Sequence, residues 1–278
     1  MIRLPLLAAA LAFTGSAAPI VVTGDAVAQP TRIVSANLCA DQLLLAVADP
    51  AQIAALTRNA RDPWMSAAAK QAQPFRMIRG TAEEILTLDP DLIVGAPEFR
   101  TTQWRGMARR NIAALDLPFA NSLSDIQTQL RAVATATGHP ARGQKIAAQM
   151  DAALAKLRRT GQGRVAAYYQ RRGYVTGTGT LVDELMTRAG LVNLATQLGK
   201  GPLARLTLEE MVAANPDILI VETDSPTVTD QGAEMLQHPA LRHIPRVSLP
   251  QAWTVCGGPA YVQAARSLTT QLAAIPAK

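Results

Sequence analysis

The sequence predicts an α/β protein made of two similar halves separated by a helical block. Three observations lead to this prediction. Short apolar runs typical of buried strands alternate with helical patterns along most of the chain, as in parallel sheets covered by helices. Residues 124–160 carry helical patterns only, and one fourteen-residue pattern occurs twice at a constant offset of 126 residues. We expect an N-terminal lobe over residues 29–123 and a C-terminal lobe over residues 161–278.

The composition fits a folded protein of two domains. The chain has 278 residues, of which 49% are hydrophobic and 17% are charged. Its net charge is +6, but the basic residues occur singly or in pairs, and few aromatic residues accompany them. This pattern argues against nucleic acid as a partner. With two cysteines, the chain has neither the framework of a disulfide-rich miniprotein nor a cysteine-rich zinc module.

The first 28 residues have the features of a signal peptide. Arg3 precedes an apolar run at residues 4–13, and Ala26-Val27-Ala28 offers the small-x-small pattern that signal peptidase cleaves. The apolar run is shorter than the ~20 residues of a membrane-spanning helix, and an N-terminal membrane anchor is the alternative interpretation. We expect cleavage near Ala28 and an exported, periplasmic protein that begins at Gln29.

The elements of the first half follow from local patterns. Strands are predicted at residues 32–35, 53–56 and 92–94, where short apolar runs stand between polar or turn-forming residues. A helix is predicted at residues 41–48, between the first two strands. This order predicts a parallel sheet with crossover helices.

The helical block contains two helices. Ser124 is the expected N-cap of the first, because apolar residues follow it at helical spacing. The second helix is expected from about Ala141 to Arg159. A strand predicted at residues 164–169 then restarts the α/β alternation in the second half.

The internal repeat relates the two halves directly. Residues 81–94 and 207–220 share five identities in fourteen positions. Each copy has a Thr N-cap, a Glu three residues later that closes a capping box, a Pro-Asp stop and an apolar strand. A single repeat at this distance indicates two copies of one domain type.

The same repeat separates two pairs of glutamates. Glu84 and Glu210 occupy the capping-box positions, so they have a structural role. Glu83 and Glu209 stand in the first helical turn but do not close the box. They either stabilise the helix through its dipole or form a matched pair of carboxylates for a two-fold partner.

Four segments together resemble a known family. They are Arg32-Ile33-Val34-Ser35 with the helix after it, Thr81 to Val94, Gly177 to Met186 with Ala189-Gly190-Leu191-Val192-Asn193, and Thr207 to Val221 with His238-Pro239-Ala240-Leu241. In order and spacing they are similar to the periplasmic solute-binding proteins for iron chelates and vitamin B12, which are the captor subunits of ABC importers. The resemblance covers residues 31–275.

The resemblance implies a fold, a ligand and a partner. It implies two Rossmann-like lobes with parallel sheets, joined by a single long backbone helix within residues 124–160. It implies a monomer without catalytic activity or cofactor that holds a metal chelate between the lobes. It also implies docking onto an ABC permease dimer with its ATPase subunits, through Glu83 on one lobe and Glu209 on the other.

In this family the ligand lies against loops at the carboxyl ends of the strands. The corresponding ligand-binding residues expected here are Asn37, Cys39, Trp64, Arg100, Arg171, Arg172, Trp253 and Cys256. Trp64 and Trp253 would provide apolar walls for a large planar ligand, and the arginine pair would bind anionic oxygens. Ordinary packing of the tryptophans and a solvated arginine pair are the alternatives. The first loop, residues 37–42, departs from the Ser-Pro-rich loop usual in relatives.

The two cysteines leave three alternatives open. The resemblance places Cys39 and Cys256 in cleft loops of opposite lobes. They could be buried as inert thiols, they could form a disulfide that staples the cleft and obstructs a bulky ligand, or their thiolates could ligate a metal centre in the ligand. A periplasmic thiol-dependent enzyme is the alternative function, although no histidine lies in the cleft loops to serve as its base.

The resemblance leaves a corrinoid and a ferric siderophore as the main ligand candidates. A corrinoid is favoured because the cleft offers tryptophan and thiol groups but few charges beyond the Arg171-Arg172 pair. Haem is less favoured, because haem-binding relatives often have a Tyr where this chain has Phe75-Arg76-Met77. His139, His238 and His243 are not clustered, so binding of a bare metal ion is not expected. A periplasmic haem or chelate sensor is a further alternative.

Overall fold

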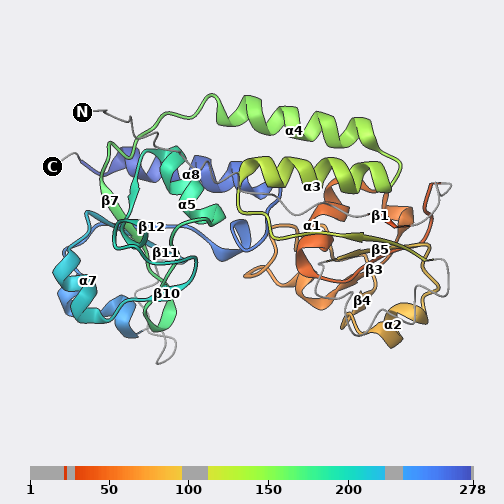
Figure 1. Cartoon of the computed structure of the whole chain (residues 1–278), viewed down its shortest axis with the longest axis horizontal. Helices are drawn as coiled ribbons and strands as arrows, with labels where there is room; N and C mark the ends of the chain where they lie inside the picture. Colours follow the sequence, from red (N-terminus) through yellow and green to blue (C-terminus); the bar gives the residue numbers. More distant parts are fainter. Residues whose placement is uncertain (1–21, 24–28, 96–111, 223–233, 277–278) are drawn as a thin grey trace, which may run out of the picture.

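The computed structural model describes residues 22–23, 29–95, 112–222 and 234–276, and it has two α/β lobes beneath a layer of long helices (Figure 1). Each lobe contains its own parallel sheet. The fold class predicted from the sequence is therefore confirmed. Among the described residues, no helix is both long and apolar enough to cross a bilayer.

The N-terminal sheet has the strand order β1-β6-β5-β2-β3-β4. Its strands are β1 (Val22–Thr23), β2 (Ile33–Ser35), β3 (Ile53–Thr57), β4 (Met77–Ile78), β5 (Leu92–Gly95) and β6 (Ala113–Asp116). Neighbouring strands are parallel except β1, which is antiparallel to β6. The three strands predicted for this half are present as β2, β3 and β5. Helix α1 (Leu38–Val47) begins three residues before the prediction, and α2 (Ala82–Leu86) precedes β5.

Two residues of the predicted signal peptide belong to this sheet. Val22 and Thr23 form β1 at its edge, and the rest of residues 1–28 lies outside the described residues. Because β1 is a short edge strand, a chain that begins at Gln29 keeps the five parallel strands. Gln29 itself contacts the helical layer, since its Nε2 donates to the carbonyl oxygen of Thr137 at 3.5 Å.

The C-terminal sheet has the strand order β12-β11-β7-β9, and all of its strands are parallel. These strands are β7 (Val165–Tyr168), β9 (Val192–Asn193), β11 (Ile218–Val221) and β12 (Arg246–Ser248), and a separate antiparallel pair joins β8 (Tyr174–Val175) to β10 (Ala204–Arg205). The helices of this lobe are α5 (Leu181–Ala189), α6 (Leu194–Gln197), α7 (Leu208–Ala214) and α8 (Ala260–Ala274). Strand β7 confirms the strand predicted at residues 164–169.

The internal repeat corresponds to a repeat in three dimensions. The order β6-β5-β2-β3 in one lobe matches β12-β11-β7-β9 in the other. Asp89 and Asn215 occupy the same repeat position, and both have left-handed backbones with φ values of 46° and 42°, which short polar side chains tolerate best among non-glycine residues. Asp91 and Asp217, two residues later, both accept hydrogen bonds from backbone N–H groups at the start of the neighbouring strand, β2 or β7.

The predicted capping boxes form completely in one copy and by half in the other. In α7 the Thr207 hydroxyl accepts from the Glu210 N–H at 3.1 Å, and the Glu210 carboxylate accepts from the Thr207 N–H at 2.8 Å. In α2 the Thr81 hydroxyl accepts from the Glu84 N–H at 3.3 Å. The Glu84 carboxylate instead accepts from the N–H of Arg79 at 2.6 Å. Both glutamates therefore have structural partners, as the sequence predicted.

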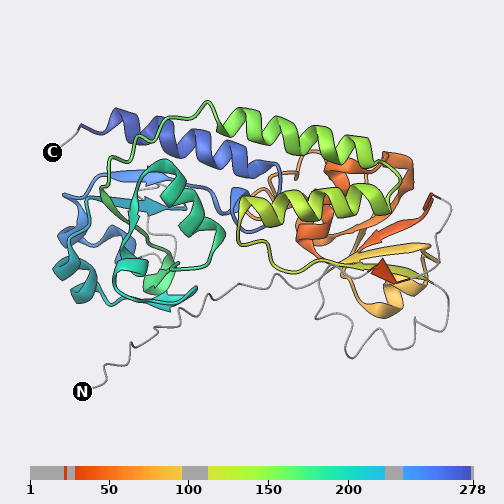
Figure 2. The same cartoon turned by 45° about the horizontal axis from the view of Figure 1, so that its top comes forward.

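The helical block differs from the prediction at both ends. Helix α3 (Leu123–Ala136) is capped by Ser122 and not by Ser124, because the Ser122 hydroxyl accepts from the N–H three residues later at 3.1 Å. Helix α4 (Pro140–Leu154) ends five residues before Arg159. It packs against α3 and then against α8, which continues the helical layer over the C-terminal lobe (Figures 1 and 2).

A single cluster of buried apolar side chains extends through both lobes. It includes Leu43 of α1, Leu130 of α3, Met150 of α4, Leu185 of α5 and Leu268 of α8. Burial of each such side chain contributes about 1.5–3 kcal/mol. Because the lobes share this core, large movements between them would expose apolar surface, and the structure favours a fixed arrangement.

A polar contact adds to this connection. The Glu184 carboxylate on α5 accepts from the backbone N–H of Leu123, at the start of α3, at 2.6 Å. Arg188 donates to the same carboxylate at 3.0 Å and to the hydroxyl of Tyr261 at 3.2 Å. Glu184 thus links α5 of the C-terminal lobe to the start of α3 in the helical block.

A disulfide joins the lobes covalently. Cys39 lies in the first turn of α1, and Cys256 lies in the segment before α8; their Cα atoms are 5.1 Å apart. The bridge closes a loop over a sequence separation of 217 residues. Of the three alternatives for the cysteines, the structure therefore has the disulfide.

We predict that replacing both cysteines (C39S/C256S) lowers the free energy of unfolding by about 2–5 kcal/mol, because the bridge restricts a very long loop in the unfolded chain. Chemical denaturation of the oxidised wild type and the double variant measures the loss. Reductant should reduce the stability of the wild type by a similar amount and leave the variant unchanged. Equal stability of the two oxidised proteins would contradict the prediction.

Candidate functional site: the interlobe cavity

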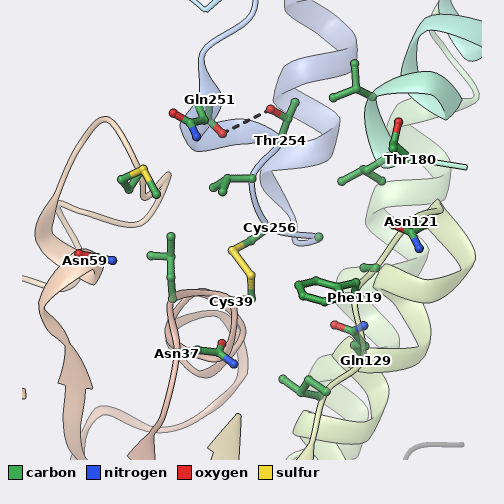
Figure 3. Close-up of a pocket in the computed structure, with 18 of the residues that line it drawn as sticks. Asn37, Cys39, Asn59, Phe119, Asn121, Gln129, Thr180, Gln251, Thr254 and Cys256 are labelled. Carbon is green, nitrogen blue, oxygen red and sulfur yellow. Dashed lines mark hydrogen bonds between the residues drawn. A yellow bond between two sulfur atoms is a disulfide. The ribbon is translucent and has the colours of Figure 1, made fainter. Parts of the chain in front are cut away.

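A cavity of about 690 Å³ lies between the two lobes, within the size range of small-molecule sites. The N-terminal lobe and the start of the helical block contribute Ala36, Asn37, Leu38, Cys39, Thr57, Asn59, Met65, Arg79, Leu117, Pro118, Phe119, Ala120, Asn121 and Gln129. The C-terminal lobe contributes Tyr168, Gln170, Thr176, Thr180, Leu181, Val182, Gln251, Thr254, Val255, Cys256 and Gly257. Figure 3 shows side chains from both lobes around this space.

The cavity is built by the carboxyl ends of strands. Asn37 follows β2, Thr57 ends β3, Phe119 follows β6, and Tyr168 ends β7. Parallel strands place these ends at one edge of each sheet, where open α/β sheets bind their ligands. The two edges face each other across the cavity.

Among the polar residues of its lining, uncharged side chains greatly outnumber charged ones. Six carboxamides line it, namely Asn37, Asn59, Asn121, Gln129, Gln170 and Gln251, together with the hydroxyls of Thr57, Thr176, Thr180, Thr254 and Tyr168. Among the described lining residues, only Arg79 carries a charged side chain. Phe119 is 76% exposed and adds an aromatic surface. The lining offers many neutral donors and acceptors beside apolar groups.

The disulfide forms part of the cavity wall. In the view of Figure 3, Phe119 lies to one side of the disulfide and Asn37 lies below it. Both sulfur atoms are used in the bond, so the alternatives of a thiolate ligand to a metal and of a thiol nucleophile are wrong for this structure. A cavity of about 690 Å³ exists with the bond in its wall; this does not test the expectation that the bond obstructs a bulky ligand.

Only some of the predicted ligand-binding residues line the cavity. Asn37 and both cysteines do. Trp64, 69% exposed, does not line it, and Trp253 lines a separate hollow beside it that also contains Arg61 and Lys70.

The predicted arginines are not among the lining residues either. Arg171 and Arg172 lie exposed in a short 3₁₀ turn after β7, beyond Gln170, which does line the cavity. Arg172 has a left-handed backbone there, with a φ of 58°. Arg100 lies outside the described residues.

Several lining residues were missed by the sequence analysis. Phe119 and Asn121 follow β6, whose sequence Ala-Ala-Leu-Asp gives a weak strand signal. Tyr168 ends a strand that was predicted, so the rule of strand carboxyl ends could have identified it. Gln129 lies on α3, and its Nε2 donates to the carbonyl oxygen of Pro118 at 2.6 Å; nothing in its sequence context indicates this position.

A buried carboxylate supports the first cavity loop. Asn37 caps α1 by accepting from the Ala40 N–H at 2.9 Å. One turn into this helix, Asp41 is fully buried and accepts from the N–H of Thr57 at 2.9 Å and from its hydroxyl at 2.5 Å. Burial raises the pKa of Asp41 to about 6, although hydrogen bonds from Ser35 and Thr57 act in the opposite direction.

Asp41 should make stability depend on pH. Because its pKa is higher in the folded protein than in the unfolded chain, its stabilising contribution is complete below about pH 4 and is lost as pH rises through about 6. We predict that Asp41→Asn, which has no proton to lose, becomes more stable relative to the wild type by about 1–3 kcal/mol between pH 4 and pH 7. Urea unfolding of both proteins across this range measures the difference. A difference that stays constant with pH would contradict the prediction.

The two free glutamates lie on one side of the molecule. Glu83 of α2 and Glu209 of α7 are exposed, and both helices lie on the side away from α4 (Figures 1 and 2). The pKa of Glu209 is lowered by hydrogen bonds from its own backbone N–H and from the Thr207 hydroxyl. The helices that carry these two exposed carboxylates therefore lie on the same side of the molecule.

The histidines have loop and capping roles in the described structure. His139 lies within hydrogen-bonding distance of Gln52, at 2.8 Å, and His238 caps a turn by accepting from the Ala240 N–H at 3.2 Å. His243 pairs with the side chain of Asn215 at 3.2 Å. No group of three or more His, Cys, Asp or Glu side chains that could hold a metal ion occurs among the described residues.

Comparison with known proteins identifies the family. A family model described as periplasmic binding protein matches residues 33–248. The chain belongs to this family. A curated vitamin B12-binding protein from Pectobacterium carotovorum is 24% identical over 265 residues, covering 90% of this chain and 91% of the relative. A vitamin B12-binding protein from Pectobacterium atrosepticum is 23% identical over 266 residues, covering 89% of this chain and 90% of the relative.

Solved structures agree with the fold. The apo form of the periplasmic heme-binding protein RhuT from Roseiflexus superimposes with a TM-score of 0.70 at 25% identity, covering 87% of this chain and 97% of that one. The vitamin B12-binding protein BtuF of Vibrio cholerae gives a TM-score of 0.69 at 19% identity, covering 88% and 97% of the two chains. Solved proteins with this fold thus include a heme-binding protein and a vitamin B12-binding protein.

Proposed function

We propose that this chain is the substrate-binding subunit of an ABC importer, without catalytic activity, and that its ligand is a corrinoid. The family assignment supports the first part. One observation carries the second: the described cavity lining combines six carboxamides with a single charged side chain. A corrinoid carries carboxamide side chains around its ring, and these match neutral donors and acceptors.

The competing ligands fit this lining less well. Haem carries two carboxylates, and many ferric siderophores are anionic, so both favour sites with several cationic groups. Arg79 is the one cation among the described lining residues. The curated vitamin B12-binding relatives support the same choice.

We predict that the purified, oxidised protein binds cyanocobalamin with a Kd of about 1 µM or below, because the cavity supplies uncharged partners for its amides. Titration calorimetry, with haem and a ferric siderophore as comparison ligands, measures this preference. Tighter binding of haem or the siderophore would reject the corrinoid assignment. Absence of binding by all three would reject the chelate-binding function.

Docking onto the permease is proposed for Glu83 and Glu209, one exposed carboxylate on each lobe. Two exposed carboxylates on helices at the same side of the molecule suit a partner with two-fold symmetry and cationic contact sites. These glutamates lie outside the cavity lining, so docking and ligand binding should be separable.

We predict that the double variant E83A/E209A loses corrinoid uptake in cells that carry the cognate permease and ATPase, while its cyanocobalamin affinity stays at the wild-type value. Asp151→Ala provides the control, because Asp151 is an exposed carboxylate on α4, on the other side of the molecule. Wild-type uptake by the double variant would show that docking uses other residues.

A further inference from the structure

The side chain of Tyr168 is an unexplained polar group in the cavity wall. It ends β7, is 2% exposed and lines the cavity. Its hydroxyl is buried, and no described residue meets the full geometry of a hydrogen bond with it. Thr254 is a polar neighbour close enough to lower the pKa of Tyr168 by hydrogen bonding, but its hydroxyl also donates to the carbonyl oxygen of Gln251 at 3.4 Å. Buried hydroxyls normally have partners, because leaving one without a partner is unfavourable.

The adjacent residue gives an internal comparison. Tyr169 is also fully buried, and its hydroxyl also lacks a hydrogen-bond partner among the described residues. Successive side chains along an extended strand point to opposite faces of the sheet. Tyr168 accordingly belongs to the core cluster that reaches the cavity, whereas Tyr169 belongs to a separate cluster and does not line the cavity. Of the two tyrosines, only Tyr168 therefore belongs to the cavity lining.

The residues around Tyr168 indicate which chemical group of a ligand its hydroxyl would bind. Beside it, Gln170 Nε2 donates to the Glu222 carboxylate at 2.8 Å, and Gln170 Oε1 accepts from the Thr176 hydroxyl at 3.3 Å. Gln170 is thus held in a fixed orientation. Burial and then the negative charge of Glu222 raise the pKa of Tyr168, so its hydroxyl keeps its proton. The nearby carboxylate disfavours an anionic group at this place.

We propose that Tyr168 determines ligand specificity by donating a hydrogen bond to an uncharged carbonyl oxygen, such as that of a carboxamide, on the ligand. This inference rests on the proposed corrinoid-binding function and assigns the residue that distinguishes an amide from a carboxylate. The Glu222 charge excludes the carboxylate, and the protonated hydroxyl selects the acceptor. A phenolate ligand to a metal would require loss of a proton that both burial and Glu222 retain.

The first test compares Tyr168→Phe with the matched control Tyr169→Phe, using cyanocobalamin in titration calorimetry. The two variants each remove one buried hydroxyl from adjacent residues of the chain, so their effects on thermal stability should be similar. We expect the affinity to fall by about tenfold in Y168F, the loss of one hydrogen bond, and to stay unchanged in Y169F. Equal affinities for Y168F and the wild type would overturn the inference.

The second test examines the amide preference itself. Its probes are cobalamin monocarboxylic acids, in each of which one carboxamide is hydrolysed to a carboxylate. The wild type should bind at least one isomer tenfold or more weakly than cyanocobalamin, and Glu222→Gln should reduce that ratio several-fold. Equal binding of all isomers by the wild type, or an unchanged ratio in E222Q, would overturn the role given to Glu222.

These outcomes distinguish a failure of the proposed corrinoid-binding function from a failure of the inference about Tyr168. A wild type that does not bind cyanocobalamin rejects the proposed function and this inference with it. A wild type that binds cyanocobalamin, with Y168F binding equally well, rejects the inference alone. A phenolate-to-iron absorption band on haem addition that is absent in Y168F would show metal ligation and overturn the donor role.

Discussion

The covalent bond between Cys39 and Cys256 holds together two walls that belong to different lobes. The chain passes from the N-terminal lobe to the C-terminal lobe through the helical block, so a cavity between the lobes needs further links to keep its shape. The shared apolar core and the Glu184 contact supply two of them. The disulfide supplies the third directly at the cavity. A site whose halves are already positioned loses less conformational freedom when it binds a ligand.

Because the two lobes are held in a fixed arrangement, the side chains that line the cavity determine which ligand binds. The carboxamides come from both lobes, so a ligand with groups around its edge meets partners on either side. The charges near the cavity are separated: Arg79 belongs to the N-terminal lobe, and Glu222, behind Gln170, belongs to the C-terminal lobe. The C-terminal wall therefore favours uncharged acceptors. Phe119 adds an aromatic surface suited to the apolar parts of a large ring.

Sequence patterns predicted the architecture better than the site. Strand runs, cap residues and the repeat are local signals, and the predicted β2, β3, β5 and β7 are all present. The resemblance to the family placed Asn37 and the two cysteines in cleft loops, and all three line the cavity. Pairing of Cys39 with Cys256 could not be chosen over the alternatives, since it depends on how closely the lobes approach. The positions of Trp64, Trp253 and Arg172 depend on the path of irregular segments, which hydrophobic periodicity does not encode.

The central claim is that the disulfide positions the cavity for its ligand and does not obstruct it. The most direct measurement is the affinity for cyanocobalamin of the oxidised wild type and of C39S/C256S, determined by calorimetry at a temperature where both are folded. The account predicts weaker binding by the serine variant, by about tenfold, because the lobes must then be ordered on binding. Equal or tighter binding by the serine variant would contradict it.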